Sequence, residues 1–257
     1  MEETKMLMML RGSRIAAAIA HQQHGARANL RFASLEAQDP MLVEKLYDNL
    51  EEKHHRLEGT IVEADEKAYR ALAQRFSSNK NVSVAYERAI TWVQEHDAQR
   101  QQHLIFDPIG FGLHKRHEWS GWLDDCLELL ATGGHYVTLG LSERSTLYGP
   151  VREMSKLYPG TCDRESLPGA PAIAALLKRK SQSYTTVDVE LPLRGQGIAG
   201  VVAGCYHFDL ADVRHALKPQ QVSLLVETIF FVRPGSDGRT YDLQRYETPE
   251  LEPALSR

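Results

Sequence analysis

The chain has 257 residues, of which 42% are apolar and 25% are charged, values typical of a folded globular protein. No apolar run approaches the roughly 20 residues of a membrane span. Acidic residues at the N-terminus and three widely spaced cysteines argue against an export signal and a disulfide framework, so we predict a cytoplasmic protein without membrane association. The formal net charge of −4 restricts any surface that binds nucleic acid to a local basic patch.

Predicted strands and helices alternate along the first 141 residues. This alternation is typical of βαβ units, which build a parallel sheet. We predict strands at 29–36, 59–65, 81–87, 103–107 and 135–141, and helices at 13–23, 40–50, 66–76, 88–96 and 119–132. Gly133 and Gly134 are interpreted as the stop of the last of these helices.

The pattern changes after residue 141. Residues 142–183 form an irregular insertion with short helices expected at 150–157 and 171–180. The segments 183–193 and 197–210 then face each other across a glycine-bearing turn, which predicts an antiparallel hairpin. A further strand or strand pair is expected at 221–234, and the last twenty or so residues are a polar tail.

An abrupt stop follows the predicted strand 103–107, where the sequence reads Asp107-Pro108-Ile109-Gly110. Parallel strands direct their carboxyl ends toward the ligand crevice, so an acid at this point predicts a functional residue. The alternative is a simple turn, since aspartate, proline and glycine are common turn residues. The basic residues Lys115 and Arg116 follow closely and are suited to phosphate contacts, or form a solvated stretch. No metal site is predicted.

Four motifs, taken in order, resemble class I S-adenosylmethionine-dependent methyltransferases. They are the Gly12-Ser13 helix start, the strand ending at Glu36, the Asp107-Pro108-x-Gly110 strand end, and the strand that begins Gly-Gly-His-Tyr. The order is similar to that of three-Cys-motif partner proteins, which often occur near mobile or defence genes, and more distantly to a bacterial rRNA adenine-N6 methyltransferase family. The resemblance implies an α/β fold, with a Rossmann-like methyltransferase domain over 1–208. This domain contains a parallel sheet that ends in a C-terminal antiparallel hairpin. A strand extension and the polar tail occupy 209–257.

The resemblance also implies site residues. S-adenosylmethionine is the implied cofactor, with Gly12 and Ser13 beside it and an acid at a strand end holding its ribose. Glu36 is the first candidate for that acid, and Glu63 with its neighbour Asp65 is the competitor. The implied catalytic loop contains Asp107, Pro108 and Gly110, in which the carboxylate orients a target amine. Phe111 is the expected stacking partner of a base, and Lys115 and Arg116 are expected to contact the substrate.

One feature departs from these families. Their glycine-rich cofactor loop precedes the Gly-Ser helix, and residues 1–11 contain no glycine. The first hypothesis is therefore methyl transfer from S-adenosylmethionine to nucleic acid, and the second is a catalytically silent subunit that binds a protein partner and no cofactor. An unrelated nucleotide-binding α/β enzyme is a third. No Gly-x-Ser-x-Gly elbow or Walker-type phosphate loop is present.

Overall fold

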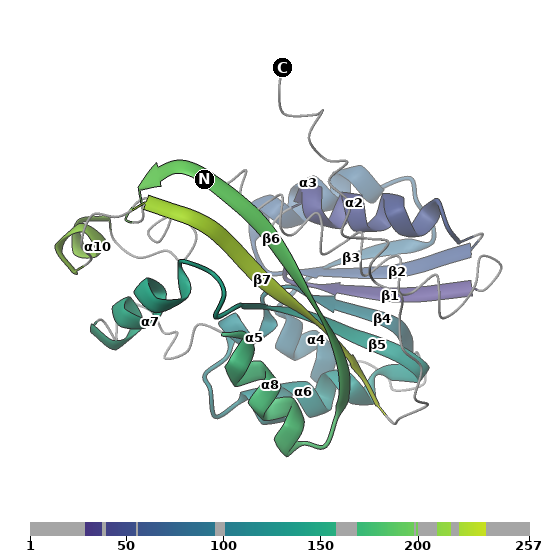
Figure 1. Cartoon of the computed structure of the whole chain (residues 1–257). Coiled ribbons are helices and arrows are strands. Elements are labelled where there is room, and N and C mark those ends of the chain that lie inside the picture. Colours follow the sequence, from purple (N-terminus) through teal and green to yellow (C-terminus); the bar gives the residue numbers. More distant parts are fainter. Residues whose placement is uncertain are drawn as a thin grey trace.

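The computed structural model describes residues 29–37, 40–54, 56–95, 101–157, 169–197, 199, 210–216 and 221–234. They form a seven-stranded sheet in the order β3-β2-β1-β4-β5-β7-β6 (Figure 1). The strands are β1 (Asn29–Leu35), β2 (Arg56–Glu63), β3 (Val82–Tyr86), β4 (Gln102–Asp107), β5 (Leu130–Leu141), β6 (Ser183–Gly197) and β7 (Gln221–Arg233). The helices are α2 (Pro40–Glu51), α3 (Glu66–Phe76), α4 (Ala89–Glu95), α5 (Gly110–Leu113), α6 (Trp119–Glu128), α7 (Tyr148–Leu157), α8 (Ala170–Arg179) and α10 (Leu210–Ala216).

The first five strands are parallel, as the sequence predicts. β1 pairs with both β2 and β4, and β4 pairs with β5. β7 runs antiparallel to β5 and to β6, which gives the C-terminal antiparallel pair. The α/β, Rossmann-like methyltransferase fold class is therefore confirmed, and the carboxyl ends of β1, β2, β4 and β5 lie along one edge of the sheet.

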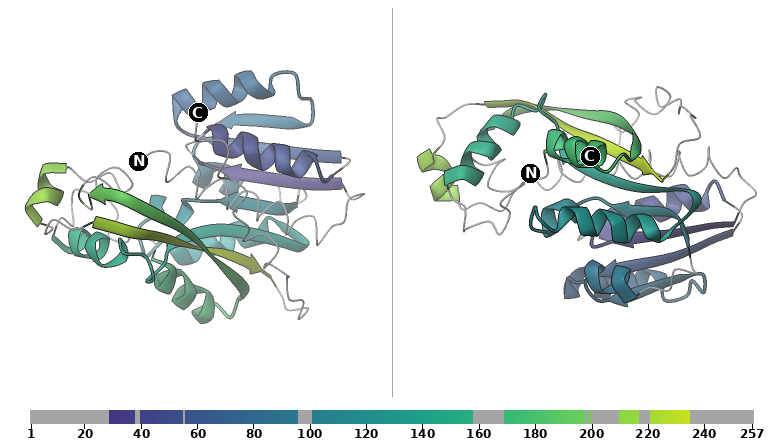
Figure 2. Two further views of the ribbon diagram at one scale, coloured as in Figure 1. Left: turned by 45° about the horizontal axis from the view of Figure 1, so that its top comes forward. Right: turned by 90° about the horizontal axis from the view of Figure 1, so that it is seen from below.

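Helices cover both faces of this sheet (Figure 2). On one face, α2 and α3 bury apolar stripes at helical spacing, so that Leu42, Leu46 and Leu72 are fully buried against the strands. On the other face, α4, α6 and α8 pack through residues that include Trp122 and Leu176. No helix among the described residues is long and apolar enough to cross a membrane.

The first arm of the predicted hairpin pairs with the C-terminal strand, because β6 runs antiparallel to β7. The other predicted arm, 197–210, lies almost wholly outside the described residues. β7 lies between β5 and β6, and a strand with neighbours on both sides and both faces covered requires a nearly continuous apolar run. Residues 224–232 supply that run, whereas 197–210 is interrupted by glycines. A strand from the segment interpreted as an extension thus completes the sheet.

Gly133 and Gly134 do not stop a helix. α6 ends at Glu128 and both glycines lie inside β5, where the pairing with β4 jumps from Gln102↔Leu130 to Leu104↔His135. Gly133 has a φ of 79°, and a Cβ on Gly134 would lie 2.8 Å from the Gln102 carbonyl oxygen. The glycines therefore permit a bulge at the start of the strand.

Candidate functional site

The sheet has a topological switch point between β1 and β4. After β1 the chain continues into α2 on one face, and after β4 it continues into α5 and α6 on the other. In open α/β sheets the two connections diverge at such a point and leave a crevice at the carboxyl ends of the strands. Glu36 follows β1, Glu63 ends β2 and Asp107 ends β4, so all three predicted acids lie at this edge.

Glu36 forms the turn that leaves β1. Its φ of 38° is left-handed, a conformation that glycine adopts freely and other residues rarely do. Its backbone N–H donates to the Val62 carbonyl oxygen at 2.8 Å, and its Oε1 accepts the N–H of Ala89, the first residue of α4. The side chain is 7% exposed. Glu36 thus fixes the turn after β1 and one of its carboxylate oxygens caps α4.

Glu63 and Asp65 have separate roles at the end of β2. The Glu63 side chain is 1% exposed, and its Oε1 accepts the N–H of Asp65 at 3.0 Å. Asp65 is the N-cap of α3, because its Oδ1 accepts the N–H of Ala68 at 2.8 Å. Since the strand that ends at Glu36 is the central β1, Glu63 is the acid at the end of the neighbouring strand, where a ribose-binding acid is expected.

The Asp107 carboxylate is held inside the protein. Its Oδ2 accepts hydrogen bonds from Tyr136 Oη at 2.6 Å and from Trp122 Nε1 at 3.0 Å, and only 1% of the residue is exposed. Its Oδ1 is buried without a hydrogen-bond partner among the described residues. Burial raises the pKa of Asp107 to about 7, although the hydrogen bonds from Tyr136 and Trp122 act in the opposite direction.

The Asp-Pro-Ile-Gly segment forms one packed unit. Pro108 is buried, and a Cβ on Gly110 would lie 1.7 Å from Asp107 Oδ2. Any side chain at position 110 would therefore displace the carboxylate. The glycine of this motif is explained by the packing of Asp107 and requires no contact with a substrate.

Phe111 lies in the core and not at a substrate surface. It is 1% exposed and its ring packs against Trp119, at 5.2 Å between centroids, and against Tyr136, at 6.3 Å. A base cannot stack on the Phe111 ring while Trp119 and Tyr136 pack against it, so the predicted role of Phe111 in base stacking is wrong. Lys115 and Arg116 are exposed after α5, as expected for a contact surface. Gly12 and Ser13 lie outside the described residues.

Three residues of the site were missed in the sequence. No site role was predicted for Trp122 in the helix 119–132 or for Tyr136 in the strand 135–141, although each donates a hydrogen bond to Asp107. Tyr86 ends β3 in register with Glu63, is 56% exposed, and has the Tyr69 ring 4.9 Å away. An aromatic residue at the carboxyl end of a predicted parallel strand was the available signal for Tyr86.

The strand order and the switch point define a Rossmann-like, methyltransferase-type fold. Solved structures agree with this fold. The chain is similar to the YcgJ protein of Bacillus subtilis, with a TM-score of 0.53 and 10% identity over 86% of this chain and 99% of that chain. A candidate sarcosine dimethylglycine methyltransferase from Galdieria sulphuraria gives a TM-score of 0.55 and 8% identity, covering 87% and 86%.

A third similar structure contains a ligand. The plantazolicin methyltransferase BamL, solved with a triazolic desmethylPZN analog and S-adenosylhomocysteine, has a TM-score of 0.51 and 14% identity, covering 88% of this chain and 86% of that chain. No protein-family model matches the sequence, and no curated protein matches it. At these identities the likeness establishes the fold alone.

Proposed function

We propose that this protein binds S-adenosylmethionine at the carboxyl edge of β1, β2 and β4 and transfers its methyl group to nucleic acid. The observation that carries the proposal is the order β3-β2-β1-β4 with a buried acid, Glu63, at the end of β2. This acid stands one strand away from the switch point. A carboxylate there is placed to accept hydrogen bonds from both ribose hydroxyls.

The residues at this edge fit the adenosyl part of the cofactor. Glu63 would hold the ribose, and the exposed ring of Tyr86 next to it offers a flat apolar surface for the adenine. Glu36 supports the turn after β1 through its left-handed φ, so the chain turns at the switch point without a glycine. The cofactor, when bound, supplies an electrophilic methyl group. The protein supplies orientation and exclusion of water.

The proposed acceptor rests on the surface that follows β4. Lys115 and Arg116 are exposed and directly follow the short helix α5 that begins at Gly110. Neither forms an ion pair among the described residues, so both charges are available to phosphate groups. This surface is local and compatible with the overall negative charge of the protein.

The cofactor site is tested by replacing Glu63. Calorimetry with S-adenosylhomocysteine is expected to show saturable binding to the wild type. Glu63→Gln is expected to weaken it by about tenfold or more, because a charge-assisted hydrogen bond contributes about 1.5–3 kcal/mol. Glu44→Gln on α2 makes the same glutamate-to-glutamine change away from this edge. This control variant should bind S-adenosylhomocysteine as the wild type does. Glu36→Gln should lower stability more than affinity, since Glu36 caps α4. Equal affinities for wild type and Glu63→Gln would exclude Glu63 as the ribose ligand.

A catalytically silent, partner-binding subunit is the second candidate, and the hydrogen bonds of Asp107 favour it. A carboxylate that already accepts bonds from Trp122 and Tyr136 has little freedom to orient a target amine. A methyl-transfer assay with bulk RNA and DNA separates the two functions. Transfer that is lost in a Lys115→Gln, Arg116→Gln double variant supports the proposed enzyme. Absence of transfer by a wild type that binds the cofactor supports the silent subunit.

A further inference from the structure

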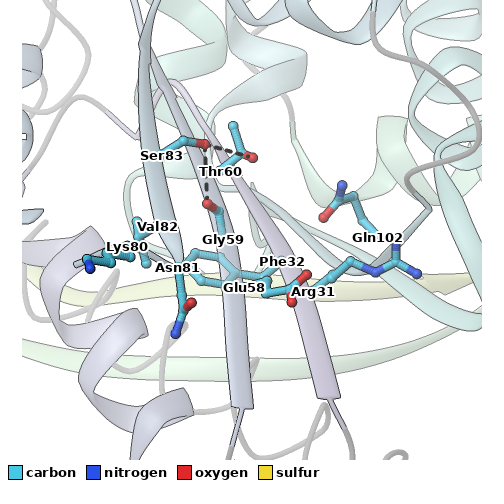
Figure 3. Close-up of a pocket in the computed structure, with 10 residues that line it drawn as sticks. All are labelled: Arg31, Phe32, Glu58, Gly59, Thr60, Lys80, Asn81, Val82, Ser83 and Gln102. Carbon is cyan, nitrogen blue, oxygen red and sulfur yellow. Dashed lines mark hydrogen bonds between the residues drawn. The ribbon is translucent and has the colours of Figure 1, made fainter.

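A polar cleft of about 310 Å³ lies on the sheet away from the proposed cofactor edge (Figure 3). Its lining comes from the first halves of β1 and β2, the turn before β3 and the start of β4. Arg31 and Gln102 lie on one side of it, and Lys80 and Asn81 lie on the other. Arg31 precedes Glu36 by five residues, which corresponds to about 16 Å along an extended strand. The cleft is therefore a separate site.

The first halves of β1 and β2 carry polar side chains on the face of the sheet that α4 covers further along. In the second halves of β1 and β2, Leu35 and Val62 face α4 and are fully buried. At alternate positions before them on the same face stand Arg31, Thr60 and the partly buried Glu58. Parallel sheets are normally apolar on both covered faces. A polar half of such a face, over which none of the described helices packs, is suited to contact with solvent or a polar ligand.

The charges in the cleft favour an anion. Arg31 and Lys80 form no ion pair among the described residues. The one carboxylate in the lining, Glu58, is already paired with Arg56 at 2.9 Å, although Arg31 is its register partner on β1. The lining therefore carries two cations and one carboxylate, and that carboxylate is paired with Arg56, which lies outside the lining.

Hydrogen-bonding groups line the cleft between the two cations. Ser83 Oγ donates a weak hydrogen bond of 3.3–3.4 Å to Thr60 Oγ1 or the Gly59 carbonyl oxygen, so it is readily redirected (Figure 3). Arg31 stands on β1 and Lys80 precedes β3, two strands apart, which places their backbones about 10 Å from each other. A ligand that contacts both cations must therefore carry more than one anionic group or extend across β2.

We propose that this cleft binds a small phosphorylated ligand, with Arg31 and Lys80 as its phosphate contacts. The guanidinium of Arg31 is suited to two-point contact with phosphate oxygens, and the Lys80 ammonium adds a second charge. Thr60 and Ser83 supply hydroxyl groups along the floor. The volume is at the lower end of the range for small-molecule pockets, so the ligand is no larger than a nucleotide.

Calorimetry of the full chain with inorganic pyrophosphate tests this site. The wild type is expected to bind, and Arg31→Gln and Lys80→Gln are each expected to weaken binding by about tenfold, as for loss of one charge-assisted contact. The conservative Arg31→Lys variant keeps the positive charge, so it should bind pyrophosphate more tightly than Arg31→Gln does. Lys178 on α8 is exposed, as Lys80 is, and neither lysine forms an ion pair among the described residues. Lys178→Gln therefore removes a comparable charge away from the cleft. It serves as the matched control and should bind as the wild type does.

The same titrations can also contradict the proposed phosphate site. Absence of pyrophosphate binding at millimolar concentration, or equal affinities for the wild type and both cleft variants, would overturn the proposal. Binding of a short thymidine oligonucleotide that is tighter than pyrophosphate and equally sensitive to Arg31→Gln would assign the phosphate contacts to nucleic acid and reject the small ligand. Affinity for S-adenosylhomocysteine is independent of this cleft, so a failure here is distinguishable from a failure of the proposed function.

Discussion

At pH 8 the Asp107→Asn variant is expected to be more stable than the wild type, by up to about 4 kcal/mol in the free energy of unfolding. This value corresponds to the difference between the ordinary aspartate pKa of 3.8 and the folded-state pKa of about 7. Below pH 4 the two proteins should have similar stability, because a protonated carboxyl and an asparagine amide are both neutral and each places a donor at the position of Oδ1, where no described partner lies. The oxygen of the asparagine keeps the bonds from Tyr136 and Trp122.

The sign of this effect follows from proton binding. Between pH 3.8 and about 7 the folded protein binds a proton on Asp107 that the unfolded chain has released. The contribution of Asp107 to stability is therefore fully present below pH 4 and is lost as the pH rises through 7. Burial is the main cause, and the charge of Glu36 acts in the same direction.

Chemical denaturation at pH 4, 6 and 8 measures this dependence. The difference between the two proteins isolates Asp107, because the titration of His114, whose pKa burial lowers, is common to both. Burial raises the pKa values of Cys126 and Tyr136, so both side chains remain neutral over this range. Stability curves that run parallel for wild type and variant would show that Asp107 is ionised in the folded protein throughout.

Local patterns were sufficient to predict most of the sheet. Apolar residues at helical spacing identified α2 and α3. Among the apolar residues of the predicted strands 103–107 and 135–141, Ile105, Phe106 and Val137 are fully buried and Leu139 is 6% exposed. Acids at the ends of predicted strands also located the proposed cofactor edge. These signals lie within a dozen residues along the chain, so no knowledge of the tertiary structure is needed to detect them.

Features that depend on distant segments were not predictable in this way. Asp107 receives its hydrogen bonds from residues 15 and 29 positions further along the chain. Trp122 and Tyr136 carry the pattern of core residues, and nothing local shows that their polar atoms point at the same carboxylate. The pairing of β6 with β7 is likewise non-local, and the choice of partner depends on which apolar run fits between two strands.

Gly110→Ala is expected to destabilise the protein by about 3 kcal/mol, the upper range for overpacking of a core. The new Cβ would lie 1.7 Å from Asp107 Oδ2 and 2.2 Å from its Cγ, so either the carboxylate leaves Tyr136 and Trp122 or the start of α5 shifts. Asp107→Ala is also destabilising, because it leaves the Tyr136 hydroxyl and the Trp122 indole N–H buried without an acceptor. That loss amounts to about 1–3 kcal/mol for each group.

The two substitutions should not add. In the Asp107→Ala background the carboxylate atoms that clash with a Cβ at position 110 are gone, so Gly110→Ala should then cost about 1 kcal/mol or less, and the coupling energy should be about 2 kcal/mol. Urea denaturation of the two single variants and the double variant measures it. Gly121→Ala on α6 is the matched control, since no described atom lies within 4 Å of its new Cβ, and alanine should be neutral or stabilising there. If the effects of the two substitutions on the free energy of unfolding add strictly, Gly110 is required for backbone conformation alone. Asp-Pro-Ile-Gly would then be a simple turn, and Gly110 would not be needed to make room for the Asp107 carboxylate.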